Sequence, residues 1–200
     1  MDLVCRGAPN ARRVAILPAA WNPPTRAHLA LAEAALAFSD EVLLALPRTF
    51  PHKEFEFASF ELRLEWLRRI AADRPGLGVA VTGGGLFLEM ARALRAADPD
   101  VQDICIVCGC DAAARFLAWP YDRGPSAIEQ LQEFSLLVAP RDEPFVAPAA
   151  VRNSVHSLTM SPEVRSISST EIRRRIAQGE PWTHWVPREV VEEAARIYQP

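Results

Sequence analysis

Short apolar runs alternate with helical patterns along nearly the whole chain, and this alternation limits the fold more than any other feature. The apolar runs fall at 13–18, 41–47, 78–82, 103–111 and 134–139. Helical patterns fall at 26–38, 59–70, 86–97, 111–117, 169–178 and 187–198. Near-continuous apolar strands that alternate with helices are typical of a parallel sheet with both faces covered. We therefore expect an α/β fold built on a doubly wound parallel sheet, with its ligand at the carboxyl ends of the strands.

The length and the prolines suggest how the chain is divided. A chain of 200 residues suits a single domain over 1–200. Within it we expect an N-terminal tail over 1–12 and a C-terminal segment over 164–200 that holds helices. Pro144, Pro148 and Pro162 make 142–162 the least regular stretch, which predicts a surface loop.

The charge balance excludes some classes of function. Lys and Arg total 22 and Asp and Glu total 25, so the formal net charge is −3, and no long basic run is present. A mildly acidic chain of this kind is a poor candidate for a nucleic-acid binder. It also lacks the run of about 18 apolar residues that a membrane helix requires, and its first residues lack the apolar core of a secretory signal. We expect a cytoplasmic protein without nucleic-acid or membrane partners, and the oligomeric state, including a homo-oligomer, stays open.

Three of the four cysteines, Cys105, Cys108 and Cys110, form a C-x-x-C-x-C pattern inside an apolar run, and Cys5 stands apart. One interpretation is a thiolate metal or redox site. The other is a set of small core residues on a buried strand, because free cysteine is among the most buried residue types. No histidine is nearby and a zinc site usually takes four ligands, so we favour the core interpretation and expect no metal site in the protein.

The first chemical motif follows the first strand, where Trp-Asn-Pro-Pro-Thr-Arg-Ala-His runs from Trp21 to His28 into a helix. Thr25 and His28 are three residues apart, which places both on one helical face at the helix start. A helix N-terminus has unpaired N–H groups and a partial positive charge, and both favour a phosphate. The spacing alone is equally consistent with a helix-capping Thr25 and a partly buried His28.

This stretch resembles the (His/Thr)-x-Gly-His signature of nucleotidylyltransferases, in the version found in nicotinate-mononucleotide adenylyltransferases. Asn22, Pro23 and His28 match that version, Trp21 replaces its Phe, and Thr25 takes the position of the first His. The resemblance implies a Rossmann-like nucleotidylyltransferase fold that binds ATP, with Trp21 and Asn22 at the nucleotide and Thr25 and His28 catalytic.

The same stretch departs from the family pattern at several small residues. Pro18 and Ala19 stand where the family has glycines, Ala20 replaces a Ser or Thr, and Ala27 replaces the motif Gly. Each extra methyl group crowds a backbone that must approach a triphosphate closely. A non-catalytic nucleotide-binding relative is therefore one of the open alternatives.

The second motif, Ile-Ser-Ser-Thr-x-Ile-Arg, runs from residue 167 to 173. We expect Ser169 or Thr170 to cap a helix, with Arg173 one turn further on, so that hydroxyls, backbone N–H groups and a guanidinium converge as they do around anions. An ordinary capped basic helix would show the same residue types. The motif matches the second family signature letter for letter, which implies that Ser168, Ser169 and Thr170 bind nucleotide phosphates and that Arg173 is catalytic.

Four further positions match the family. Lys53 and Arg141 resemble its phosphate- or acceptor-binding residues, Asp111 resembles a carboxylate at the nucleotide, and Trp119 resembles a Trp beside the nicotinate ring. Without the resemblance, Lys53 would be interpreted as a solvated surface charge, Asp111 as a helix cap and Trp119 as a core residue. Together these matches extend the resemblance over about residues 13 to 198.

The acceptor is the least defined part of this hypothesis. Family members that use nicotinate mononucleotide carry a hydroxyl-rich loop after the third strand, where this chain has a run of three glycines at 83–85. We expect that run to form a plain strand-to-helix turn. The leading interpretation is transfer of AMP from ATP to nicotinate mononucleotide or a related phosphate-bearing acceptor, with Mg²⁺ bound mainly through the ATP phosphates. Another acceptor, or CTP in place of ATP, is the main alternative.

Overall fold

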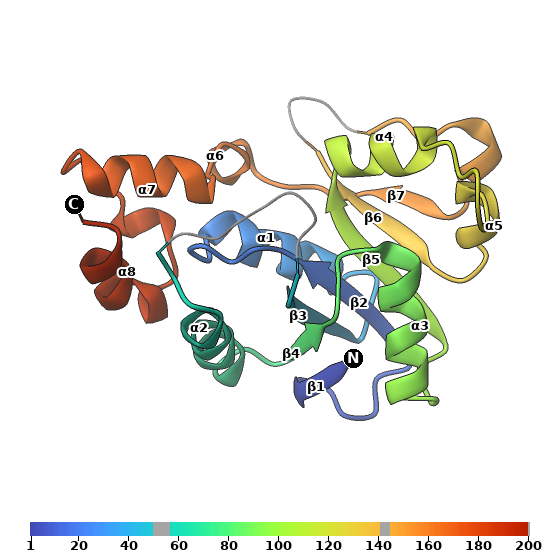
Figure 1. Ribbon diagram of the computed structural model, residues 1–200, viewed down its shortest axis with the longest axis horizontal. Helices are drawn as coiled ribbons and strands as arrows, with labels where there is room; N and C mark the ends of the chain where they lie inside the picture. The colour runs from blue at the N-terminus through green and yellow to red at the C-terminus, as the bar shows by residue number, and fades with distance from the viewer. Residues whose placement is uncertain (50–56, 141–144, 200) are drawn as a thin grey trace.

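The computed structural model describes residues 1–49, 57–140 and 145–199, and in these parts the chain forms a seven-stranded sheet in the order β1-β4-β3-β2-β5-β6-β7 (Figure 1). All neighbouring strands are parallel except β1 and β4. The expected doubly wound parallel sheet is therefore confirmed. The strands are β1 (Asp2–Cys5), β2 (Arg13–Pro18), β3 (Glu41–Pro47), β4 (Leu77–Thr82), β5 (Asp103–Gly109), β6 (Ser135–Ala139) and β7 (Val155–Ser157).

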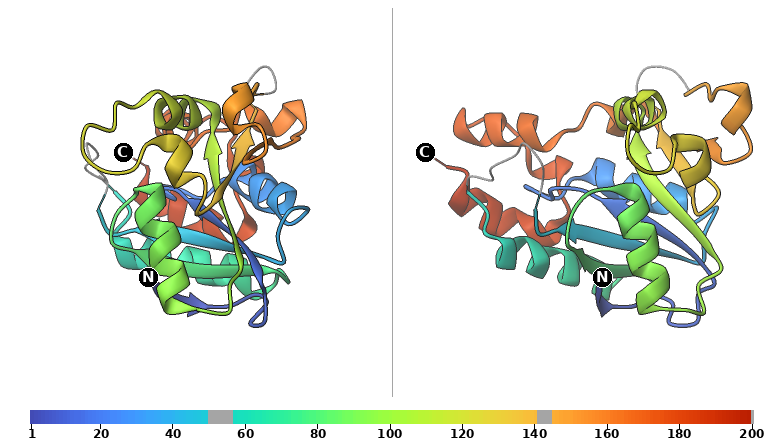
Figure 2. Two further views of the ribbon diagram at one scale, coloured as in Figure 1. Left: turned by 90° about the vertical axis from the view of Figure 1, so that its right-hand side faces the viewer. Right: turned by 45° about the vertical axis from the view of Figure 1, so that its right-hand side comes forward.

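Helices cover both faces of the sheet, as the two turned views in Figure 2 show. The α-helices are α1 (Arg26–Ala35), α2 (Phe60–Ala72), α3 (Phe87–Ala97), α4 (Cys110–Ala118), α5 (Ala127–Gln130), α6 (Pro162–Arg165), α7 (Ser169–Ala177) and α8 (Val191–Ile197). The described residues also form three short 3₁₀ turns: η1 (Ala149–Val151), η2 (Thr183–Trp185) and η3 (Arg188–Val190). The expected C-terminal helical segment thus begins with α6 and extends to α8.

Each central strand contributes to two separate hydrophobic cores. On β2, Ala15 and Leu17 face the core formed by α1, α2 and the C-terminal helices, whereas Val14 and Ile16 face the core formed by α3, α4 and α5. Side chains on a strand alternate between the two faces, so a strand covered on both sides must be apolar at successive positions. This is the physical reason why the strands appear in the sequence as continuous apolar runs.

The N-terminal tail is the first feature that differs from expectation, because 2–5 form β1 on the edge of the sheet. Arg6 anchors this segment: its Nε donates to the buried carboxylate of Glu41 at 2.6 Å, and another N–H bonds Asp98. The backbone N–H of Gly7 also donates to Glu41, at 2.6 Å. A four-residue edge strand is too short to show a recognisable period, which is why the sequence pattern missed it.

Two further expectations need correction. The described part of 142–162 is not a plain loop, because η1 and the edge strand β7 form within it. The last helix expected over 187–198 is divided into η3 and α8. Several boundaries agree with the sequence pattern, among them β2, β3 and the start of α2 after its capping residue Ser59, whose Oγ accepts from the N–H of Leu62 at 3.1 Å.

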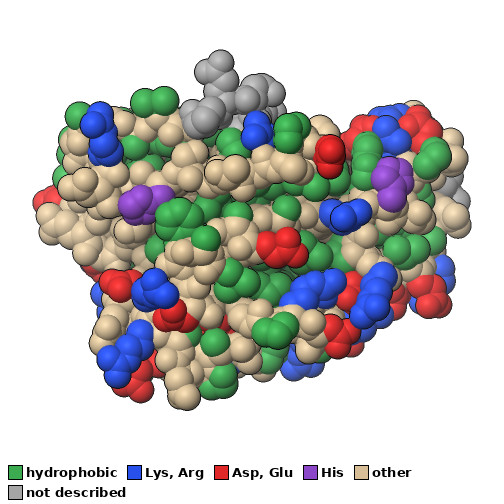
Figure 3. Space-filling model, turned by 180° about the vertical axis from the view of Figure 1, so that it is seen from behind, with side chains coloured by type: hydrophobic (Ala, Val, Ile, Leu, Met, Phe, Trp, Pro, Cys, Tyr) green, Lys and Arg blue, Asp and Glu red, His purple; other side chains and the backbone are tan. Residues whose placement is uncertain are grey.

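On the face drawn in Figure 3, basic side chains lie beside acidic ones and do not gather into a patch of one sign. Ion pairs also join α2 and the turn after it to the C-terminal helices. Arg69 contacts Glu193 at 2.9 Å, and Arg74 contacts Glu189 at 2.9 Å. Within the described parts of the chain, no helix is long and apolar enough to cross a membrane.

Candidate active site

The carboxyl edge of the sheet has a switch point between β2 and β5. From β2 the strand order continues through β3 and β4 in one direction, and from β5 it continues through β6 and β7 in the other. α1 leaves β2 toward one face of the sheet, and α4 leaves β5 toward the opposite face. Such a divergence opens a crevice at the strand ends, where ligands bind in doubly wound sheets.

Thr25 and His28 form a capping box at the start of α1. Oγ1 of Thr25 accepts from the backbone N–H of His28 at 3.2 Å, and Nδ1 of His28 accepts from the backbone N–H of Thr25 at 3.1 Å. The same Oγ1 lies 2.9 Å from Nδ1. The two side chains do meet on one helical face, but Thr25 is fully buried. Its hydroxyl contacts the His28 ring, so Thr25 sets the position of that ring.

The contact at Nδ1 also determines which nitrogen of His28 carries the proton. A backbone N–H can only donate, so Nδ1 holds a lone pair and the neutral ring is protonated at Nε2. Burial lowers the pKa of His28 to about 4, so the ring is neutral at pH 7. His28 lines a pocket of about 250 Å³ and is partly exposed there. Its Nε2–H is the hydrogen-bond donor that it can offer to a ligand.

The loop between β2 and α1 is held by contacts with distant elements. Trp21 has a φ of 55°, in the left-handed region that a bulky side chain rarely adopts, and its indole Nε1 donates to the Ala45 carbonyl at 2.8 Å. Nη1 of Arg63, on α2, donates to the Ala20 carbonyl at 2.9 Å. Trp21 is fully buried and Asn22 nearly so. Their side chains therefore support the loop from within the protein.

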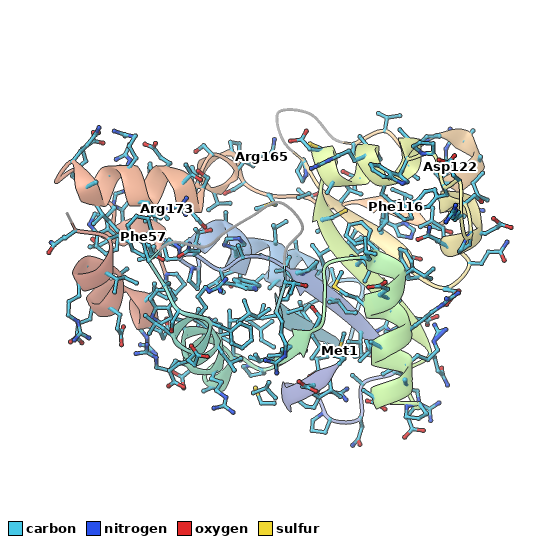
Figure 4. The ribbon with its side chains drawn as sticks, viewed as in Figure 1. Met1, Phe57, Phe116, Asp122, Arg165 and Arg173 are labelled. Carbon is cyan, nitrogen blue, oxygen red and sulfur yellow. The ribbon has the colours of Figure 1, made fainter. Side chains whose placement is uncertain are left out.

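The second motif docks directly onto this loop, although the two lie about 150 residues apart in the sequence. Nη1 of Arg173 donates to the Asn22 carbonyl at 2.5 Å, and Ser169 Oγ donates to the Pro23 carbonyl at 2.8 Å. Arg173 lies on the side of α7 turned toward the loop (Figure 4). The buried Tyr198 hydroxyl bonds Oδ1 of Asn22. The structure thus joins the two motifs into one site.

The start of α7 differs in detail from the sequence expectation. Ser168 is the N-cap, and its Oγ accepts from the Glu171 N–H at 3.2 Å. The expectation that Ser169 or Thr170 caps the helix was wrong. The Ser169 hydroxyl bonds the Pro23 carbonyl, and the Thr170 hydroxyl accepts from Nη2 of Arg173 at 3.3 Å.

Two helix N-termini contribute to the pocket beside His28. Ser168 and Ser169 at the start of α7 line it together with Thr25 and His28 at the start of α1. Arg165 lines the same pocket, and its guanidinium is fixed by two hydrogen bonds to the Met160 carbonyl, at 3.0 and 2.8 Å. Two helix N-termini and a fixed guanidinium make an anion-binding environment.

Asp111 and Trp119 lie at opposite ends of α4. Asp111 is exposed in the first turn, close to the carboxyl end of β5, and Gly109 is the N-cap, so the alternative that Asp111 caps this helix was wrong. Trp119 ends the helix with 63% of its surface exposed, which excludes the core interpretation. It lines a second pocket of about 460 Å³. Lys53 and Arg141 lie outside the described residues, and their assignments stay predictions.

The cysteines on and beside β5 fit the core interpretation. Cys108 is buried in the apolar cluster under α3 and α4, and Cys105 and Cys110 are partly buried. Burial raises the pKa of Cys108 to about 12 and that of Cys105 to about 11, which opposes the thiolate form that a metal would need. Among the described residues, no three His, Cys, Asp or Glu side chains gather as a metal site.

Two residues of the site could not be found from motifs. Tyr198 is almost at the chain end, and Arg165 belongs to the short helix α6. The contact of Tyr198 with Asn22 spans 176 residues of the sequence, and no local pattern reports such a contact. The contact of Arg165 with Met160 is local but belongs to neither motif. Arg63 on α2 also lies outside both motifs, and its bond to the Ala20 carbonyl shows that it braces the first-motif loop.

Comparisons with known proteins agree with this geometry. The family model described as cytidylyltransferase-like matches residues 16–175, a span that includes both motifs. The chain belongs to this cytidylyltransferase-like family. Among curated relatives, a probable nicotinate-nucleotide adenylyltransferase of Anaeromyxobacter dehalogenans is 33% identical over 94% of this chain and 97% of its own. One of Halalkalibacterium halodurans with the same name is 28% identical over 90% of this chain and 86% of its own.

The family fold is also found among solved structures. Nicotinic acid mononucleotide adenylyltransferase of Plasmodium falciparum, complexed with NaAD, superposes with a TM-score of 0.69 over 92% of this chain and 95% of its own. The sequence identity is 11%, so this similarity concerns the fold alone. A structure of the same protein complexed with APC gives a TM-score of 0.68 with the same coverage.

Proposed function

We propose that this chain is a nicotinate-nucleotide adenylyltransferase, which joins the phosphate of nicotinate mononucleotide to the AMP part of ATP. The observation that carries the proposal is the docking of the second motif onto the first, which brings two helix N-termini and His28 around one pocket. The full-length relatives of the family support the choice of reaction. We treat residues 1–200 as one nucleotidylyltransferase domain that acts in the cytoplasm.

In this reaction a phosphate oxygen of the acceptor attacks the α-phosphorus of ATP, and the bond to the β-phosphate oxygen breaks to release pyrophosphate. No covalent enzyme intermediate is required, so the protein has to align two anions and stabilise the charge on the leaving group. We assign to His28 the hydrogen bond that stabilises that charge. Its Nε2–H would donate this bond, and Thr25 positions the ring. A neutral donor suits this role, because it requires no protonated histidine at pH 7.

The remaining site residues receive matching roles. Ser168, Ser169 and Thr170, at the start of α7, would meet the β- and γ-phosphates together with Arg165. Arg173 would fix the loop through the Asn22 carbonyl and add positive charge beside the phosphates. Trp21 and Asn22 would support the nucleotide site from within, because their side chains are buried. Lys53 and Arg141 remain predicted phosphate or acceptor ligands.

Mg²⁺ fits this site as an ion carried by the nucleotide. The described residues contain no cluster of three ligating side chains, and Mg²⁺ usually keeps several waters and binds substrate phosphates. It would neutralise charge on the triphosphate. Asp111 at the end of β5 remains assigned to the nucleotide, and Trp119 to the acceptor.

Pyrophosphate release tests the proposal directly. Purified protein is assayed with ATP or CTP against nicotinate mononucleotide, nicotinamide mononucleotide and other phosphate-bearing acceptors. We expect the highest kcat/KM with ATP and nicotinate mononucleotide. His28→Ala should lower kcat by at least about 100-fold with little change in ATP affinity, as expected when one donor to the transition state is lost. ATP binding without release from any pair would instead indicate a non-catalytic relative.

A further inference from the structure

The pocket beside Trp119 has a chemistry of its own. Its floor includes the aromatic rings of Phe87 and Phe116, whose centroids are 5.5 Å apart, and Tyr121 packs on Phe116 at 6.1 Å. Trp119 and Leu86 border it with 63% and 59% of their surfaces exposed. An aromatic floor with an exposed apolar rim favours a flat, apolar ring as the ligand.

The charged side chains of this pocket favour an anion. Arg115 on α4 and Arg123 in the loop after it both line the pocket, and among the described residues that line it Glu89 is the one carboxylate. Two positive groups against one negative group leave a local excess of one positive charge, although the whole chain is acidic. A ring bound here is therefore favoured when it carries a negative substituent.

Both arginines are available to a ligand. In the described parts of the chain most arginines, such as Arg92 with Glu133 at 2.6 Å, have an ion-pair or hydrogen-bond partner. Arg115 and Arg123 have none there, and both are exposed. Two unpaired guanidiniums at the same aromatic pocket are an arrangement that recognises a carboxylate well, because the planar fork of arginine binds both of its oxygens.

The loop that carries Arg123 is held in place on both sides. Before it, the Tyr121 hydroxyl donates to the Phe116 carbonyl at 3.1 Å. After it, Nε2 of Gln130 donates to the Pro125 carbonyl at 2.8 Å. Phe116 and the neighbouring loop residue Asp122 lie together at the end of the molecule away from Arg173 (Figure 4). Arg123 thus belongs to a braced loop at the pocket, away from the phosphate-binding helix α7.

The turn that precedes α3 borders the pocket and offers no side-chain donor of its own. The turn over 83–85 consists of glycines, and Gly85 lines the pocket. This turn therefore has no hydroxyl group that could bind a ring substituent. The guanidinium groups of Arg115 and Arg123 are the charged donors that could bind it. The charged donors of this pocket therefore come from α4 and the loop after it.

We infer that Arg115 and Arg123 determine acceptor specificity by binding the ring carboxylate of nicotinate mononucleotide over the aromatic floor beside Trp119. The inference rests on the proposed function and names the chemistry by which that site selects its acceptor. Nicotinamide mononucleotide carries a neutral carboxamide at the same ring position. Its N–H donors would face the guanidinium donors, so the pocket disfavours it.

The test compares kcat/KM for the two mononucleotides, with ATP saturating, in the wild-type protein and in Arg115→Gln, Arg123→Gln and the double variant. We expect the double variant to lose about 10- to 100-fold in kcat/KM with nicotinate mononucleotide, the range for charge-assisted hydrogen bonds, and less than about 3-fold with nicotinamide mononucleotide. Calorimetric binding of nicotinate mononucleotide should weaken in parallel. Because both arginines are exposed, the variants should fold as the wild type does.

Arg12→Gln is the matched control, since Arg12 is exposed, has no side-chain partner in the described residues and precedes β2 at the opposite edge of the sheet. It should leave both kcat/KM values unchanged. Equal losses with the two acceptors, or no loss with nicotinate mononucleotide, would overturn the role of the arginines while the proposed function stands. A wild-type protein that releases no pyrophosphate with nicotinate mononucleotide would overturn both.

Discussion

His28 should make the protein less stable as the pH falls from 7 to 5, because the folded state disfavours its protonated form. In the unfolded chain a histidine has a pKa of about 6.5, whereas burial lowers the pKa of His28 in the folded protein to about 4. Between these values the unfolded state binds more protons. The contribution of His28 to stability is therefore fully present above about pH 6.5 and is lost as the pH falls toward 4.

The size of the effect follows from the same two values. Integration of the proton-binding difference from pH 7 to pH 5 gives a loss of about 2 kcal/mol in the free energy of unfolding. Urea unfolding of the wild type and of His28→Gln at both pH values measures it. The glutamine does not titrate, and its amide oxygen can still accept from the Thr25 N–H. The free energy of unfolding should fall by about 2 kcal/mol less in the variant than in the wild type.

A matched control is His184→Gln, which replaces an exposed histidine in η2. Its unfolding free energy at the two pH values reports what the loss of an exposed histidine does by itself, against which His28→Gln is compared. If His28→Gln and the wild type lost the same free energy between pH 7 and pH 5, the ring would not be held neutral by burial. The assignment of Nε2–H as a neutral donor to the phosphates would then lose its basis.

Three more variants test contacts in the site. Tyr198→Phe leaves the nearly buried Asn22 without this partner, so unfolding experiments should show a loss of about 1–3 kcal/mol. Steady-state kinetics of the same variant should show a higher KM for ATP, since the first-motif loop is less firmly held. Ser168→Ala removes the N-cap of α7 and should lower the unfolding free energy by about 1 kcal/mol, whereas Ser161→Ala, at an N-cap without a side-chain hydrogen bond, should change it little. Trp119→Ala should raise KM for the acceptor and leave KM for ATP unchanged; equal changes in both would place Trp119 outside the acceptor pocket.

The central sheet was predictable because burial on both faces leaves a strong signal. All seven residues of β3 are buried, and that strand appears in the sequence as one apolar run with the same ends as in the structure. The edge strands β1 and β7 have four and three residues, and at most two periods of alternation are hard to separate from loop sequence. They depend instead on long-range contacts, such as that of Arg6 with Glu41.

The site was predictable where its residues lie within a motif and not where they meet across the fold. The spacing of Thr25 and His28 predicted their shared helical face, because that geometry is local. The spacing did not predict that the Thr25 hydroxyl contacts the His28 ring, since this contact depends on how deeply the start of α1 is buried. Tyr198 was missed for the same reason, because 176 residues separate it from Asn22. Arg165 lies close in sequence to Met160 and to the second motif, but it belongs to neither motif.

The way the first-motif loop is held argues against a nucleotide-binding relative that has lost its chemistry. Ala19 and Ala27 stand where the family has glycines, and this was the ground for that alternative. Yet donors from three distant elements converge on the loop: Arg63 bonds the Ala20 carbonyl, Arg173 the Asn22 carbonyl and Tyr198 the Asn22 amide oxygen.

These bonds hold Trp21 in a left-handed conformation that a bulky residue adopts only when its surroundings determine it. Nucleotide binding alone tolerates a loop that adjusts to its ligand. Stabilising charge in a transition state requires donors that are fixed before the ligand arrives, because reorganisation during the reaction would raise the barrier. A strained loop fixed in this way by α2, α7 and the C-terminal segment is what an adenylyl-transfer site needs. We therefore interpret the alanines as a variation within a working active site.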